Sequence, residues 1–221
     1  RFAVYAQEQG IVYAEVIVNP SHWKNIPMEV LLSGVLEGFE EAGRDGLPDC
    51  RLLVSLRRDQ SDDSARRTVD WVLAHRHPRL LGLSMDGDER LAQDSNRRLG
   101  PLLWQARDAG LGVTIHAGES SGPEGVAAAL DQAGACRIDH GVRAVEDPEL
   151  LERLRREQIT LNVCLTSNVV GGLYTVQTHP LKQLYDSGIP VTLSTDDPKL
   201  LDVTLCQELA NAAALYGWTE G

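Results

Sequence analysis

Closely spaced cysteines are absent from this sequence of 221 residues. The cysteines form no Cys-x-x-Cys motif, which argues against a cysteine-ligated zinc site and against a disulfide scaffold. They are Cys50, Cys136, Cys164 and Cys206. This usage indicates a reduced, cytoplasmic setting. Long apolar runs are missing as well, since none approaches the roughly 20 residues that a transmembrane helix needs.

Basic residues are also fewer than acidic residues. Lysine and arginine total 21 against 32 aspartates and glutamates, which gives a net charge of −11 at pH 7. Because an acidic protein is poorly suited to phosphate backbones and anionic membranes, we expect neither nucleic acid nor a membrane as a partner. The hydrophobic fraction of 43% is enough for a sizeable core. The length suits one large α/β domain, so a single domain over residues 1–221 is predicted.

Seven short apolar segments have the composition of buried parallel strands, which are apolar on both faces. Amphipathic helical segments lie between them, for example at 28–42 and 147–157. The alternation predicts a parallel α/β fold. The expected strands are 12–18, 52–56, 80–84, 113–116, 137–140, 160–164 and 191–195.

An open doubly wound sheet and a closed (β/α)8 barrel both fit this alternation. Polar residues gather at the carboxyl ends of several strands, which a barrel brings into one ring. An open sheet would spread them in a line, about 4.8 Å apart per strand. We therefore predict a TIM-type (β/α)8 barrel. A barrel needs eight strands, and the sequence starts with Arg1 instead of Met. We expect the first strand, and the C-terminal end, to be missing.

Two predicted strands end in histidine. His116 is followed three residues later by Glu119, and His140 is followed by Gly141. A neutral imidazole is a good zinc ligand, and a nearby carboxylate can transfer protons beside a metal. Each motif alone is more typical of a histidine that is hydrogen-bonded for structural reasons than of a catalytic site.

Other strands end in acidic or amide groups. Asp196 and Asp197 precede Pro198 and fit either a helix cap or a metal ligand beside a substrate-binding carboxylate. Ser167-Asn168 and the acidic segment around Gly87 fit ordinary turns. Consecutive strand units that end in His, His, Ser-Asn and Asp-Asp nevertheless indicate one polar cavity.

In their order and spacing, these motifs resemble the adenosine deaminase family of the metal-dependent amidohydrolase superfamily. The resemblance extends from about Tyr13 to about Leu200. The matching segments are His116-Ala117-Gly118-Glu119, His140-Gly141, Ser167-Asn168, His179-Pro180-Leu181, Ser194-Thr195-Asp196-Asp197-Pro198 and Gly87-Asp88-Glu89.

The resemblance implies hydrolytic deamination of a 6-aminopurine with one zinc ion per subunit. His116 and Asp196 are then metal ligands, and His140 orients and deprotonates the attacking water. Glu119 donates a proton to the purine ring. It must be protonated to do so, and we expect burial or hydrogen bonding to raise its pKa. The Gly87 backbone and the Asp197 side chain are then substrate-binding groups that contact other ring nitrogens.

One part of the family's ligand set has no counterpart here. The family's first strand ends in His-x-His, and no histidine precedes His22. His75 and His77 have the same His-x-His spacing. They precede a strand, however, so we expect them at the N-terminal face of the barrel, opposite the active site. Because a catalytic zinc ion normally has three or more protein ligands, we expect the missing pair before Arg1 and weak zinc binding by this chain.

The substrate is the least determined feature. Asp139 stands where adenosine deaminases more often have glycine and adenine deaminases often have aspartate. Gly87-Asp88-Glu89 looks like the nucleoside enzymes, so we expect an adenosine-type nucleoside. Adenine and aminodeoxyfutalosine, an intermediate of menaquinone synthesis, remain alternatives.

Two other functions stay open as well. They are a non-catalytic barrel that binds purines or a partner protein, and metal-assisted hydrolysis of another amide or amidine. The intact set of His116, Glu119, His140 and Asp196 argues against a non-catalytic protein. The oligomeric state is not predicted.

Overall fold

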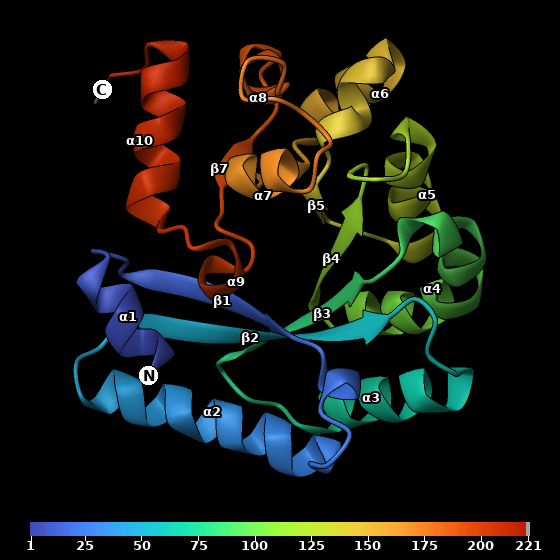
Figure 1. Cartoon of the computed structure of the whole chain (residues 1–221). Helices are drawn as coiled ribbons and strands as arrows, with labels where there is room; N and C mark the ends of the chain where they lie inside the picture. The colour runs from blue at the N-terminus through green and yellow to red at the C-terminus, as the bar shows by residue number, and fades with distance from the viewer. Residues whose placement is uncertain (220–221) are drawn as a thin grey trace. The chain divides into compact units, whose positions relative to one another are not determined.

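The computed structural model describes residues 1–219, which fall into two compact units (Figure 1). Unit 1 comprises residues 1–114 and 132–135, and unit 2 comprises residues 115–131 and the described residues from 136 onward. The chain passes from one unit to the other within a strand. The single domain expected from the sequence stays a prediction.

Seven strands follow one another in sequence order. Each expected strand is present, with ends that shift by a few residues, and the pairings of β1 with β2, β2 with β3, β5 with β6 and β6 with β7 are parallel. The strands are β1 (Tyr13–Val18), β2 (Asp49–Arg57), β3 (Leu80–Asp86), β4 (Gly112–Ala117), β5 (Arg137–His140), β6 (Thr160–Val163) and β7 (Val191–Leu193).

Unit 1 is built around β2, whose residues are buried on both faces, as expected of a central parallel strand. Helices α2 and α3 pack against it (Figure 1). In α2, Leu32, Leu36 and Phe39 recur at helical spacing and are buried, which explains why this segment is helical. The helices of this unit, with α2 and α3 among them, are α1 (Phe2–Glu8), η1 (Pro20–His22), α2 (Met28–Arg44), α3 (Asp62–Ala74), η2 (Glu89–Leu91) and α4 (Ala92–Asp108).

In unit 2, two helices begin at residues whose side chains cap the helix N-terminus. Asp147 caps α6, where its side chain accepts bonds from the backbone N–H groups of Glu149 and Leu150 at 2.9 and 3.2 Å. Thr204 begins α10 with a capping box. After β4 the elements are α5 (Pro123–Ala133), η3 (Val142–Glu146), α6 (Pro148–Glu157), α7 (Leu165–Val170), α8 (Leu181–Asp186), α9 (Pro198–Leu201) and α10 (Leu205–Tyr216).

None of the helices within residues 1–219 has both the length and the apolar character needed to cross a membrane. In unit 2 the predicted site residues lie at or just beyond the carboxyl ends of β4, β5 and β7. In parallel α/β folds this edge carries the active site.

Candidate metal centre

Three side chains of unit 2 converge. His116 lies near the end of β4, His140 is the last residue of β5, and Asp196 follows β7. Each offers one ligand atom, and these atoms all lie within 4.8 Å of one another. Two imidazoles and a carboxylate are groups that hold zinc in catalytic sites, so the donor set fits this metal. The structure thus brings His140, for which we predicted proton transfer, beside the predicted ligands His116 and Asp196.

The backbone is left-handed at two of these residues. The φ angle is 65° at His140 and 56° at Asp196. Residues other than glycine rarely adopt this conformation, and those that do are often found in functional sites. Among residues 1–219 the other two cases are Gln158 and Asp202, which end helices α6 and α9. The two without a helix-capping role therefore mark the site.

A ladder of polar side chains supports His116 from the neighbouring strands. Asp139, Asn162 and Thr192 are register partners across β5, β6 and β7. Thr192 Oγ1 donates to Asn162 Oδ1 at 2.7 Å, and Asn162 Nδ2 donates to Asp139 Oδ1 at 2.7 Å. The other oxygen of Asp139, Oδ2, lies 3.3 Å from Nδ1 of His116. A carboxylate beside one ring nitrogen favours a proton on that nitrogen, which leaves the other nitrogen, Nε2, for a metal.

Glu119 lies beside His140. Its Oε1 atom is 3.6 Å from Nδ1 of His140. The His140 side chain is only 2% exposed, and burial, followed by the nearby His116, lowers its pKa. His140 is therefore neutral near pH 7, the state in which an imidazole binds a metal or accepts a proton.

Gly118 sets the spacing between His116 and Glu119. Its φ angle is 70°, and a Cβ atom there would lie 2.5 Å from Cγ2 of Val126. The backbone N–H of Gly118 donates to Oγ of Ser121 at 3.1 Å. Only glycine fits this turn without displacing its neighbours.

Ser167 and Asn168, which we placed at the predicted polar cavity without an individual role, contact the site from the start of α7. Ser167 Oγ donates to Oδ2 of Asp196 at 2.7 Å. Asn168 Nδ2 donates to Oε1 of Glu119 at 3.0 Å and lies 3.2 Å from Nδ1 of His140. Their position after β6, beside strands that end in the predicted site residues, agrees with this placement.

The two predicted substrate contacts lie in different units. Asp197 is the N-cap residue of α9 in unit 2. Gly87 follows β3 in unit 1, with a φ angle of 92°. The contacts of both groups with a purine stay predictions.

His75 and His77, which we expected not to bind metal, make structural contacts within unit 1. Nδ1 of His75 lies 2.7 Å from the carbonyl oxygen of Trp71, and the two rings stack with centroids 4.2 Å apart. Nε2 of His77 lies 3.0 Å from Oε1 of Glu40. Neither histidine belongs to the potential ligand group found within the described part of the chain.

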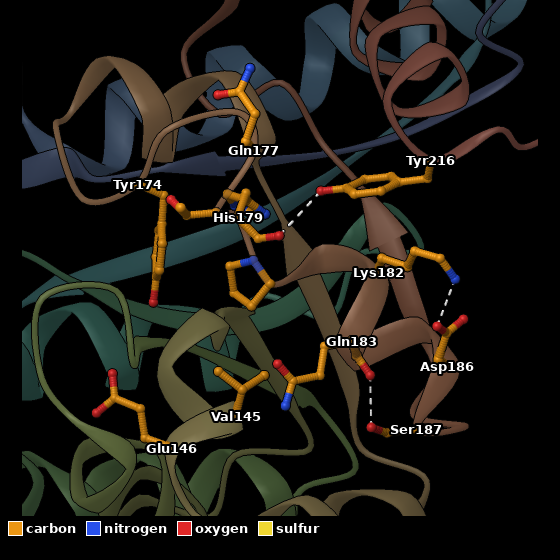
Figure 2. Close-up of a pocket in the computed structure, with 12 residues that line it drawn as sticks. Val145, Glu146, Tyr174, Gln177, His179, Lys182, Gln183, Asp186, Ser187 and Tyr216 are labelled. Carbon is orange, nitrogen blue, oxygen red and sulfur yellow. Dashed lines mark hydrogen bonds and ion pairs between the residues drawn. The ribbon is translucent and has the colours of Figure 1, made fainter.

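An open groove of about 730 Å³ is lined by residues of unit 2 (Figure 2). Tyr216 lines this groove, and its hydroxyl group donates to the carbonyl oxygen of His179 at 3.3 Å (Figure 2). None of the three potential metal ligands lines this groove. The groove and the metal centre are thus separate surfaces of the same unit.

Comparison with known proteins identifies relatives of the whole described chain. The family model described as adenosine deaminase matches residues 2–221. A protein named adenine deaminase from Sinorhizobium medicae is 39% identical over 218 residues, which is 97% of this chain and 66% of that protein. The chain therefore spans about two thirds of the length of such relatives.

Solved structures agree with this match. The crystal structure of adenine deaminase from Arthrobacter aurescens superposes with a TM-score of 0.90 at 28% identity, covering 99% of this chain and 67% of that one. An amidohydrolase from Burkholderia ambifaria with bound zinc gives a TM-score of 0.85 at 28% identity, covering 98% of this chain and 62% of that one. The predicted fold class is confirmed by these structures. Since the family model matches nearly every residue, the chain belongs to the adenosine deaminase family.

Proposed function

We propose that the protein is a zinc-dependent deaminase that converts adenine and water into hypoxanthine and ammonia. The observation that carries this proposal is the convergence of His116, His140 and Asp196 beside the carboxylate of Glu119. Relatives that are 36–39% identical to this chain are named adenine deaminase, and a structural neighbour holds zinc, which supports both the reaction and the metal.

In the proposed reaction, His140 and Glu119 each transfer a proton beside the zinc ion. When bound, zinc lowers the pKa of a coordinated water toward 7, which makes hydroxide available at neutral pH. His140 is buried and neutral, so it can accept the proton of the attacking water. Glu119 can give its proton to a ring nitrogen next to the carbon under attack, which relieves the negative charge that would build up there. The amino group then leaves as ammonia, and the oxygen of water stays on the purine.

The choice of adenine over a nucleoside rests on Asp139 as well as on the relatives. Asp139 is 5% exposed and lies directly against His116, so the aspartate often found in adenine deaminases is part of the support of a metal ligand here. An adenosine-type nucleoside, which Gly87-Asp88-Glu89 indicates, is the second candidate. Both candidates share the same attack on carbon 6.

Ammonia release from adenine, adenosine and aminodeoxyfutalosine, measured side by side with added zinc, tests the proposal. We expect the highest kcat/KM with adenine. A higher value with adenosine would replace adenine by a nucleoside, and ammonia release from none of the three would refute the deaminase assignment. The Asp196→Asn variant is the matched control, because it keeps the shape of a ligand and removes its charge.

The cellular setting and the organisation of the chain extend the same proposal. The four cysteines within residues 1–219 are free, which fits a reducing compartment such as the cytoplasm. A single catalytic domain fits the family match over residues 2–221. Limited proteolysis with and without zinc tests whether the chain is a single domain. In a single domain, zinc should slow cleavage in both units together.

A further inference from the structure

A chain of hydrogen bonds connects His179 to the catalytic pair. Nε2 of His179 lies 3.2 Å from Oδ1 of Asn168. Nδ2 of Asn168 in turn contacts Oε1 of Glu119 at 3.0 Å and Nδ1 of His140 at 3.2 Å. Asn168 is fully buried and His179 is 5% exposed, so water does not compete for these bonds. All four residues belong to unit 2.

A backbone N–H group determines which atoms donate and which accept along this series of hydrogen bonds. The N–H group of Leu181 donates to Nδ1 of His179 at 3.2 Å, so Nδ1 is an acceptor. In a neutral imidazole the proton then sits on Nε2, which donates to Oδ1 of Asn168. Burial, followed by the charge of His140, lowers the pKa of His179 to about 4, so the ring is neutral near pH 7.

This direction determines which way the Asn168 amide points. With Oδ1 occupied by the donor of His179, the NH2 group faces Glu119 and donates to its Oε1 atom, and the same nitrogen lies 3.2 Å from Nδ1 of His140. A Glu119 carboxyl that accepts on Oε1 carries its own proton on Oε2. The amide therefore leaves one oxygen of Glu119 available for proton transfer.

We infer that Asn168 is a positioning residue that orients Glu119 and His140, and that His179 acts only through Asn168 by fixing its amide. The inference deepens the proposed function and rests on it for the reaction concerned. His179 also lines the groove of unit 2, and its ring meets Tyr174 edge-on with centroids 5.3 Å apart, so its position is set from both sides.

A double-mutant cycle on the 221-residue chain tests the inference. Residues that support metal ligands and catalytic groups are typically worth about 10- to 100-fold in activity or metal affinity. We expect Asn168→Ala to lower kcat on adenine, and to weaken zinc binding, by factors on this order, with a much smaller change in KM. His179→Ala should have a similar effect in the wild-type background and none in the Asn168→Ala background.

Two further variants separate positioning from folding. Asn168→Asp can still accept from His179 but cannot donate to Glu119, so we expect the loss of kcat seen with Asn168→Ala, and the melting temperature of each variant shows whether it is folded. His179→Gln offers an N–H donor near the position of Nε2, so we expect it to restore most of kcat. Asn211→Ala, an exposed change in α10, is the control and should match wild type.

Two results would overturn the inference. One is an Asn168→Asp variant with wild-type kcat and zinc affinity, and the other is a cycle in which the effects of His179→Ala and Asn168→Ala multiply. If the wild-type chain releases no ammonia from adenine, the proposed function fails, whereas the zinc affinities of the same variants still decide whether His179 acts through Asn168.

Discussion

The Oδ2 atom of the Asp139 carboxylate lies 3.3 Å from the ring nitrogen Nδ1 of His116. The oxygen on the other side of the carboxylate, Oδ1, is held by Asn162, whose amide is held by Thr192. Three side chains on three adjacent strands thus line up beside the predicted metal ligand His116. Such supporting groups raise the basicity of a histidine ligand and prevent its ring from rotating.

We expect Asp139→Asn to weaken zinc binding by about 10- to 100-fold, because the amide keeps the shape of the carboxylate and loses its charge. Competition with a chelator of known affinity measures this change. The exposed change Asp131→Asn should leave zinc affinity unchanged. Equal affinities of the Asp139→Asn variant and wild type would show that the ladder does not support the metal ligand.

Glu119→Gln should lower kcat on the order of 10² to 10⁴, because glutamine keeps the shape of the side chain but has no transferable proton. Zinc content should stay the same, since Glu119 does not belong to the group His116, His140 and Asp196. Steady-state ammonia release and metal analysis of the same sample check both parts. A near-normal rate would exclude Glu119 as the proton donor.

Gly118→Ala should destabilise the protein by about 1 to 3 kcal/mol, because alanine is strained at a positive φ angle and its Cβ would collide with Val126. Another glycine provides a control, because its replacement by alanine should stabilise the protein. Gly38 lies in the exposed face of α2 with no atom within 4 Å of an added Cβ, so Gly38→Ala should stabilise by up to about 1 kcal/mol. Urea unfolding measures both variants, and destabilisation of equal size would contradict the argument.

His179 should make the stability of the folded protein depend on pH. Its pKa falls from 6.5 to about 4 on folding, so between these values the unfolded chain binds a proton that the folded chain does not. Stability from this group is therefore complete above pH 6.5 and declines as the pH falls to about 4. The full effect is on the order of 3 kcal/mol, at about 1.4 kcal/mol per pKa unit.

Comparison with His179→Gln isolates this contribution, because the other titrating groups are the same in both proteins. Unfolding free energies of the metal-free proteins between pH 4 and pH 7 should diverge, with wild type losing more stability on acidification. Parallel profiles would show that His179 titrates normally in the folded state.

The sequence alone determined the strands and the candidate site residues. Parallel strands that are buried on both faces give short apolar runs, which is why all seven expected strands appear. Left-handed turns, in contrast, leave no such signal at His140 or Asp196, since neither residue is a glycine. The family resemblance supplied the roles of these residues, and the family match confirmed the resemblance.

Only the tertiary structure decided which side chains support them. Asp139, Asn162 and Thr192 become neighbours through the register of three strands, and no local pattern in the sequence specifies that register. Asn168 reaches Glu119, 49 positions away along the chain, because α7 begins at the same edge where β4 ends. Hydrogen bonds between side chains depend on positions within a few tenths of an ångström, and these are set by the packing of the whole unit and not by local sequence.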